Sequence, residues 1–319
     1  MMDVKIALPV LISFAISAAA GPIVIPILRK LKVGQTVRDD GPQTHLKKNG
    51  TPTMGGVIFL LAVLITSLIY APQYPKVIPV LFMTVGFGIV GFLDDFIKVV
   101  LHRSEGLTPG QKMAGQLVVT AVFAYYMVKI SDVGLTLKVP FFPNISLDPG
   151  WLSIPLLFFV VIGTVNGTNF TDGLDGLAAS VTVMVAVFFS VVALGTNAGI
   201  APITLAVVGG LLGFLLFNVY PASVFMGDTG SLALGGFVAS TAYMMNMPLF
   251  LLLVGLIYLV EVLSVMIQVT YFKATHGKRF FKMAPIHHHF EKCGWSETRV
   301  VTVFSIITAL CCLVALAGI

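Results

Sequence analysis

Residues 163–177 read GTVNGTNFTDGLDGL, and this stretch decides the fold. Asn166, Asn169, Asp172 and Asp175 fall within ten residues, between the apolar runs WLSIPLLFFVVIG and LAASVTVMVAVFFSVVAL. Acidic and amide side chains in a loop between two lipid-soluble segments are costly to hold at a bilayer surface, and they usually serve a function. The stretch therefore predicts a membrane protein with a functional site where two spanning helices end.

The composition supports a membrane protein. Apolar residues (AVILMFWYC) make up 57% of the 319 residues and charged residues 10%, whereas soluble domains contain about 25% charged residues. No polar linker divides the apolar segments, so we expect one integral membrane domain over residues 1–319. Cys293, Cys311 and Cys312 have neither a disulfide-framework nor a zinc-site spacing.

Ten apolar segments predict an all-α polytopic membrane protein with about ten transmembrane helices. They cover residues 4–28, 54–70, 77–93, 113–128, 152–165, 177–194, 200–217, 232–247, 249–272 and 300–318. The ninth segment is long enough to tilt or break. Residues 132–148 alternate in polarity and contain two prolines, which predicts a small β-hairpin.

Lysine and arginine set the orientation. With ten spans, 15 of the 19 basic residues fall in loops on one side, which the positive-inside rule assigns to the cytoplasm. Both termini and the hairpin are then external. The loops that hold Asp172 and Asp228 contain no basic residue, yet alternation places them on the cytoplasmic side.

Three acidic stretches are expected to meet on that side around a divalent cation. Asp94 and Asp95 end the third segment, and Lys98 follows Asp94 by one turn on the same face. The two aspartates of TDGLDG (171–176) would share a face if this stretch were helical, and its glycines let a ligand approach the backbone. Asp228 lies in the glycine-rich stretch FMGDTGS. Such carboxylates can bind Mg²⁺ or move a proton.

Each acid also has a purely structural interpretation. Asp94 and Lys98 could form an ion pair at a solvated helix end. Thr171 or Asp172 could cap the sixth helix, and Asp228 could satisfy its own turn. These interpretations do not exclude the functional ones.

Three further features have two interpretations each. The loop HLKKNGTPTMGG (45–56) suits phosphate contact or membrane anchoring, and it is not a P-loop. HGKRFFKMAPIHHHFEKCGW (276–295) suits a phosphate-binding lid or anionic lipid, because neighbouring histidines rarely face one ion. We interpret Glu261, an acid inside the ninth segment, as a hydrogen-bonded core residue rather than a proton relay.

Six motifs occur together in one order: GTPTMGG, GFLDDFIK, LTPGQKMAGQ, NGTNFTDGLDGLA, FNVYPASVFMGDTGSLALGG and APIHHHFE. With them, nearly the whole chain resembles the phospho-N-acetylmuramoyl-pentapeptide transferase family, which belongs to the polyprenyl-phosphate N-acetylhexosamine-1-phosphate transferase superfamily. The aspartate pair and the Asn/Asp-rich loop are shared across that superfamily. GTPTMGG and PIHHHFE point to the muramoyl-pentapeptide branch.

The resemblance implies a Mg²⁺-dependent, multi-pass enzyme of the bacterial inner (plasma) membrane with a cytoplasmic active site. It would transfer phospho-MurNAc-pentapeptide from UDP-MurNAc-pentapeptide to undecaprenyl phosphate, forming lipid I and UMP. This step belongs to peptidoglycan synthesis, and so to cell wall biogenesis, cell shape and cell division. Membrane lipids would surround the chain, no nucleic acid would bind, and a homodimer is compatible with the sequence.

Position by position, the resemblance also implies roles for individual residues. The catalytic residues would be Asp94, Asp95, Asp228 and His287, with Asp228 the metal ligand. The nucleoside pocket would contain Asn169, Asp172, Gly173, Leu174 and Asp175, with Phe225 stacking on uracil. Further substrate contacts would be Lys48, Thr53, Lys112, Asn218, Gln268, His287 and His288.

Alternatives stay open at this point. Asp94 or Asp95 could deprotonate or orient the lipid phosphate for direct attack, or an aspartyl-phosphate intermediate could form. A UDP-GlcNAc:polyprenyl-phosphate GlcNAc-1-phosphate transferase would share the acids but lack PIHHHFE. A cation or lipid transporter would place its acids at mid-span and often show repeated halves, which this sequence does not.

Overall fold

The computed structural model describes residues 4–31, 50–100 and 106–319. The elements are, in chain order, α1 (Val4–Lys30), α2 (Gly56–Tyr70), α3 (Val77–Val100), α4 (Pro109–Lys129), β1 (Leu137–Val139), β2 (Phe142–Leu147), η2 (Gly150–Leu152), α5 (Ser153–Thr171), α6 (Leu177–Gly195), α7 (Ala201–Asn218), α8 (Gly227–Met244), η3 (Pro248–Phe250), α9 (Leu251–Val254), α10 (Leu256–Ala274), α11 (Ile286–Lys292) and α12 (Glu297–Leu316). Each predicted span overlaps a helix of 15 or more residues. Seven helices in the described part are long and apolar enough to cross a membrane, so the chain is a multi-pass membrane protein.

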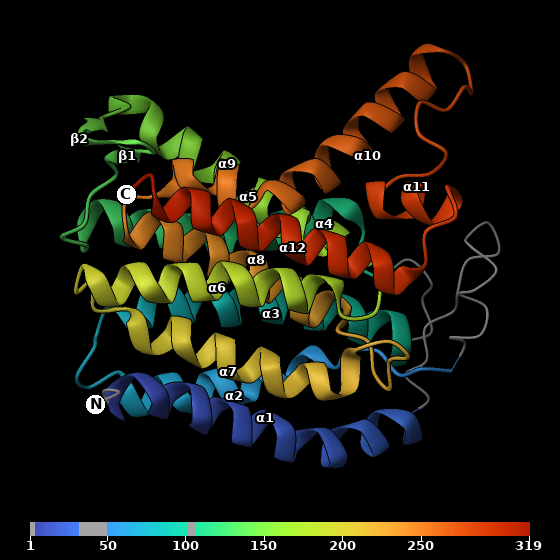
Figure 1. Cartoon of the computed structure of the whole chain (residues 1–319), viewed down its shortest axis with the longest axis horizontal. Helices are drawn as coiled ribbons and strands as arrows, with labels where there is room; N and C mark the ends of the chain where they lie inside the picture. Colours follow the sequence, from blue (N-terminus) through green and yellow to red (C-terminus); the bar gives the residue numbers. More distant parts are fainter. Residues whose placement is uncertain (1–3, 32–49, 101–105) are drawn as a thin grey trace.

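The long helices lie side by side in one bundle (Figure 1). The start of α1, the end of α12 and the β1–β2 hairpin lie at one end of it. The α5–α6 turn, the α7–α8 turn and α11 lie at the other end, and α10 projects away from the bundle (Figure 1). The acidic turns are thus separated from the hairpin by the length of the bundle.

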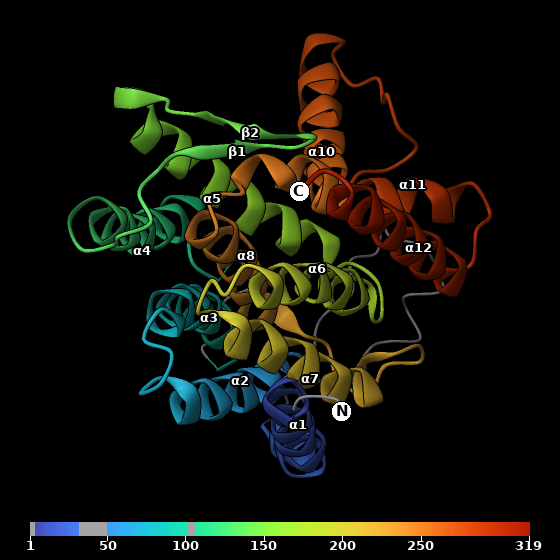
Figure 2. The same ribbon diagram turned by 60° about the vertical axis from the view of Figure 1, so that its left-hand side comes forward.

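Helix α8 forms the centre of the bundle, between α3 and α5 (Figure 2). Every residue from Thr229 to Met244 is buried. Its sequence is rich in Gly, Ala, Ser and Thr, which let neighbouring helices approach closely. For example, a Cβ on Gly235 would lie 2.4 Å from the Cα of Val165 on α5. Because α8 is enclosed by protein, it does not need the apolar surface of a lipid-facing span, and it is not among the seven.

Near the acidic turns, helices α5 and α8 extend beyond their predicted spans. Helix α5 continues to Thr171, so Asn166 and Asn169 are helical rather than part of a loop. Asn166 finds a protein partner there, because its Nδ2 donates to Gln116 Oε1 of α4 at 3.0 Å. Helix α8 begins at Gly227, which puts Asp228 in its first turn.

The expected cap of the sixth helix is wrong. The N-cap of α6 is Gly176, which has a φ of 78° and makes no side-chain cap bond. Thr171 ends α5 instead, and Asp172 follows it in a turn. Asp172 and Asp175 therefore do not share a helix face.

Two smaller expectations are confirmed. Strands β1 and β2 pair antiparallel, with Leu137 opposite Leu147 and Lys138 opposite Ser146, so a hairpin forms within residues 132–148. The ninth apolar segment breaks at Gly255 into η3 and α9 before it and α10 after it.

Candidate active site

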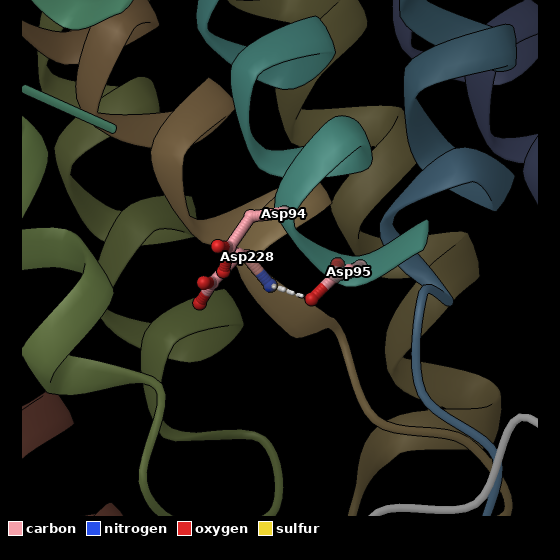
Figure 3. Close-up of side chains that lie close together, drawn as sticks. All are labelled: Asp94, Asp95 and Asp228. Atoms are coloured by element: carbon pink, nitrogen blue, oxygen red, sulfur yellow. Dashed lines mark hydrogen bonds between the residues drawn. The ribbon is translucent and has the colours of Figure 1, made fainter. Parts of the chain in front are cut away.

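Helices α3 and α8 touch at a glycine beside the acids. A Cβ on Gly91 would lie 2.0 Å from the backbone oxygen of Asp228, so only glycine lets α3 approach the start of α8 this closely. Asp94 and Asp95 follow one turn later on α3. One carboxylate oxygen from each of Asp94, Asp95 and Asp228 lies within 4.8 Å of the others (Figure 3). The fold thus brings together acids that are far apart in the sequence.

Asp95 binds the start of α8. Its Oδ1 accepts a hydrogen bond from the Asp228 backbone N–H at 3.2 Å (Figure 3). Its Oδ2 accepts from the Thr229 N–H at 2.8 Å and the Thr229 hydroxyl at 2.6 Å. A carboxylate in this position caps the N-terminus of a helix and complements its dipole. Asp95 therefore fixes the orientation of Asp228.

Asp94 faces two lysines instead. Lys98 Nζ lies 2.5 Å from Asp94 Oδ2 and 3.1 Å from Asp228 Oδ2. Lys112 Nζ lies 2.8 Å from the same Asp228 oxygen. Asn169 Nδ2 donates to the other oxygen, Oδ1, at 2.8 Å. The predicted Asp94–Lys98 ion pair is present, but Lys98 also reaches Asp228, so it belongs to the cluster.

The donor set fits a divalent cation. Asp94 and Asp95 are 2% and 4% exposed, and three carboxylates face two ammonium groups, which leaves one negative charge uncompensated. Hard cations such as Mg²⁺ or Ca²⁺ prefer oxygen ligands of this kind. Asp95 binds two backbone N–H groups of α8, whereas Asp228 contacts the side chains of Lys98, Lys112 and Asn169, which can rearrange around an ion. Asp228, with Asp94 beside it, is therefore the better ligand. The cluster could therefore bind a metal ion.

The turn at 172–176 is tied to its surroundings by hydrogen bonds. Asp175 Oδ2 accepts from the Ala222 N–H at 2.9 Å, and the Asp175 N–H donates to Glu297 at 2.6 Å. Asn218 Oδ1 accepts from the Gly176 N–H at 3.1 Å. Asp175 and Asn218 are 5% and 3% exposed. Their side chains join the turn to the end of α7 and the α7–α8 turn.

Asp172 lies in the same turn, and the nearby carboxylates affect the pKa of its side chain. Burial raises the pKa of its carboxyl well above the usual range, and the negative charges of Asp228, Asp95 and Asp175 add to the effect. The Gly227 backbone N–H lowers this pKa by hydrogen bonding. Asp172 is therefore electrostatically part of the acidic site.

The three consecutive histidines have three different partners. His287 Nδ1 lies 3.0 Å from Glu261 Oε1, and His288 Nδ1 lies 2.7 Å from Glu291 Oε2. His289 accepts a hydrogen bond from a backbone N–H in the preceding loop. They do not converge on one ion, as expected for neighbours in the chain. Glu261 is hydrogen-bonded in the core, as we interpreted it, and its partner is His287.

Two other predicted residues lie at the start of α8 or just before it in the chain. Thr53 is 7% exposed, and a Cβ on Gly227 would lie 2.8 Å from its hydroxyl oxygen. Phe225 is held by its backbone, which accepts from the Gly55 N–H and donates to the Pro52 oxygen, both at 2.8 Å.

Two predicted residues in the described part of the chain are not brought into the cluster. Gln268 Oε1 accepts from the Phe281 N–H at 2.9 Å and so anchors the loop before α11. Leu174 is 4% exposed and packs in the core, so only its backbone can serve a ligand. Lys48 lies outside the described residues.

Comparison with known proteins establishes the family. Residues 48–60 match signature 1 of the phospho-N-acetylmuramoyl-pentapeptide-transferases, and residues 77–246 match the model of glycosyl transferase family 4. A phospho-N-acetylmuramoyl-pentapeptide-transferase of Acetivibrio thermocellus is 54% identical over 308 residues, or 95% of this chain and 92% of the relative. The chain belongs to the phospho-N-acetylmuramoyl-pentapeptide-transferase family.

Two other members of this family are at least 50% identical to the chain. The phospho-N-acetylmuramoyl-pentapeptide-transferase of Clostridium perfringens strain 13 is 50% identical over the full length of both chains. That of Clostridioides difficile is 53% identical over 94% of this chain and 93% of its own. The resemblance stated from the motifs is confirmed, and the chain is a phospho-sugar transferase of a membrane-embedded family.

Proposed function

We propose that this chain transfers phospho-MurNAc-pentapeptide from UDP-MurNAc-pentapeptide to undecaprenyl phosphate, releasing UMP and forming lipid I for peptidoglycan synthesis. Family membership supports the substrates and the reaction. The observation that carries the proposal is the cluster of three carboxylates and two lysines at one end of the bundle.

The two lysines suit a diphosphate. Phosphoryl transfer depends on positioning and charge neutralisation more than on covalent help from the protein. Lys98 and Lys112 both place Nζ within 3.1 Å of Asp228 Oδ2, so two positive charges already converge on one point. We assign them to the phosphate oxygens of the UDP substrate.

The three aspartates take different roles in this proposal. Asp228 would hold Mg²⁺ with Asp94 beside it, and the ion when bound would neutralise charge on the diphosphate oxygens. Asp95 holds the first turn of α8 and so positions Asp228. Asp94, which faces the lysines, is the better candidate to accept a proton from the acceptor phosphate or to orient it.

We favour a direct-attack mechanism. An oxygen of the acceptor phosphate attacks the phosphorus linked to the sugar, and UMP leaves. Direct attack requires no covalent bond to a protein side chain, and it leaves the Asp94–Lys98 ion pair free to orient the acceptor phosphate. Exchange of labelled UMP into UDP-MurNAc-pentapeptide without the lipid acceptor would instead support an aspartyl-phosphate intermediate.

The nucleoside is assigned to the neighbouring turn. Asn169, Asp172 and the backbone of Gly173 and Leu174 would contact it, with Phe225 stacking on the uracil ring. Asp175 and Asn218 would shape this pocket, because their side chains bind the backbone of the α7–α8 turn and of the α6 N-cap, respectively. Further contacts are proposed for Lys48, Thr53, Gln268, His287 and His288.

We place the enzyme in the bacterial plasma membrane, with ten spans, external termini and a cytoplasmic site. The bias of basic residues supports this orientation. The arrangement in Figure 1 agrees with it, since the start of α1 and the end of α12 lie at the opposite end of the bundle from the acidic turns.

A UMP-release assay on the purified protein tests the function. UDP-MurNAc-pentapeptide and UDP-GlcNAc are each offered with undecaprenyl phosphate, with Mg²⁺ and with a chelator in its place. We expect UMP only from the muramoyl substrate and only with Mg²⁺. Release from UDP-GlcNAc alone would identify the sister GlcNAc-1-phosphate transferase, and full activity in chelator would refute the metal assignment.

A further inference from the structure

Away from the acidic cluster, the structure pairs a glutamate with a histidine inside the protein. Glu261 on α10 and His287 on α11 have side chains that are 0% and 1% exposed. His287 Nδ1 lies 3.0 Å from Glu261 Oε1. Burying two ionisable groups costs free energy, and a buried pair is a weak way to gain stability. The roles assigned above leave Glu261 without a function.

The other ring nitrogen of His287 faces the turn at 172–176. A Cβ on Gly173 would lie 2.1 Å from Nε2, so the imidazole packs directly on the bare backbone of this turn. Nε2 is buried and has no hydrogen-bond partner among the residues that the structure describes. Buried polar atoms are nearly always paired, so an unpaired one calls for an explanation. Its position at the end of the bundle that holds Asp172 points to a ligand bound at this turn.

The distribution of protons between Glu261 and His287 determines whether Nε2 can donate a hydrogen bond. An unbalanced buried charge is costly, so the pair is most stable when it is neutral overall. It is then either a carboxylate beside an imidazolium or a carboxylic acid beside a neutral imidazole. Both ring nitrogens carry hydrogen in the first arrangement. In the second, the acid donates to Nδ1 and the ring hydrogen is on Nε2, so Nε2 is a donor in both.

We propose that Glu261 is a positioning residue that occupies Nδ1 of His287 and thereby presents Nε2–H to an anionic oxygen of the nucleoside diphosphate substrate. The inference rests on the proposed function, since the diphosphate is the anion that this site would bind. The partner of one histidine nitrogen sets the role of the other. His288 and His289 have other partners, so this arrangement is specific to His287.

Protonation of the ring can be measured without any activity. The full chain is labelled with ¹⁵N-histidine in lipid bilayers, and the His287 signals are assigned by their loss in His287→Gln. We expect a protonated Nε2 in the wild type and in Ser264→Ala, and two ring tautomers in Glu261→Leu. Ser264 is a matched control, since it is buried one turn along α10 and its hydroxyl donates only to the Glu261 backbone oxygen at 2.7 Å. An unprotonated Nε2 in the wild type would overturn the proposal.

Kinetics tests whether the pair serves the reaction. We expect Glu261→Leu to lower kcat of UMP release by about 10–100-fold, the usual cost of losing a carboxylate that orients a histidine. KM should change less than about threefold, because the contact strengthens as charge develops on the leaving group. Glu261→Gln should recover part of the loss, since its amide still reaches Nδ1, and Ser264→Ala should match the wild type.

The outcomes separate the two proposals. Equal kcat in the Leu and Gln variants, or wild-type kcat in a folded Glu261→Leu, would reject the positioning role. Absence of UMP release from the wild type would reject the proposed function instead, while the ¹⁵N measurement would still decide the state of His287.

Discussion

Asp94 and Asp95 are neighbours in the sequence but perform different tasks in the structure. Asp95 accepts three hydrogen bonds from the first turn of α8, whereas Asp94 forms an ion pair with Lys98 and accepts a hydrogen bond from the Leu107 backbone N–H. We expect Asp95→Asn to lose the charged cap, which costs about 0.5–2 kcal/mol. Asp94→Asn should leave stability close to that of the wild type while lowering the rate of UMP release by about 100-fold or more.

Thermal unfolding in detergent, at one heating rate, measures the stability of both variants. The control is Asp132→Asn, which removes an exposed pair with Lys76 and should change Tm little. A Tm loss in Asp94→Asn that exceeds the loss in Asp95→Asn would contradict this division of roles.

At this scale the sequence predicted contacts that depend on local spacing and missed those that depend on the fold. The four-residue spacing of Asp94 and Lys98 indicated their contact. The substrate contact predicted for Asn218 stays a prediction, and nothing local to Asn218 shows that its side chain binds the α5–α6 turn 42 residues away. Likewise, nothing local to Glu261 shows that its partner is 26 residues later in α11.

The close contact of α3 and α8 sets the geometry of the acidic cluster. A Cβ on Gly91 would lie 2.0 Å from the Asp228 oxygen and 2.7 Å from the Thr229 nitrogen, and both are backbone atoms that cannot rotate away. We expect Gly91→Ala to push the helices apart at a cost of about 1–3 kcal/mol. Because Asp94 and Asp228 would separate, UMP release should fall by about 100-fold.

Gly163→Ala is the matched control for this helical glycine. It lies in α5, and a Cβ placed on it would have no atom within 4 Å, so alanine should be neutral or slightly stabilising. Tm and UMP release are compared for the two variants. Equal behaviour of Gly91→Ala and Gly163→Ala would show that the α3–α8 contact does not set the site.

The helices themselves follow from apolar patterning, but their ends at the site do not. An apolar segment is predicted to end where polar residues begin. The sequence therefore predicts that the fifth span ends at residue 165 and the eighth begins at residue 232. In the structure the polar ends continue as helix, because Asn166 binds Gln116 and Asp95 caps α8. Protein partners replace water there, and a single-sequence pattern contains no information about such partners.

Across the whole molecule, the distribution of basic residues favours one orientation, and the fold separates the two sets of segments that this orientation assigns to opposite sides. Fifteen of the 19 basic residues fall on the side that alternation of ten spans gives to the acidic loops. Figure 1 places α11 and the acidic turns at one end of the bundle and β1–β2 at the other. The criterion of apolar length alone finds seven spans, because it omits the short α2, the enclosed α8 and α4. An orientation experiment therefore tests the ten-span topology more directly than hydropathy does.

Native and introduced cysteines mark the two ends of the bundle. Cys293 is exposed just after α11, and Asn144 is exposed in β2. With a membrane-impermeant maleimide, we expect Cys293 to react in inside-out vesicles and not in right-side-out vesicles. The double variant Cys293→Ser, Asn144→Cys should show the reverse pattern, and Cys293→Ser alone should react in neither.

In the ten-span topology the chain crosses the membrane an odd number of times between β2 and α11, through α5, α6, α7, α8 and α10. Reaction of both positions from the same side would require an even number of crossings, and that would exclude this topology together with a cytoplasmic site opposite an external hairpin.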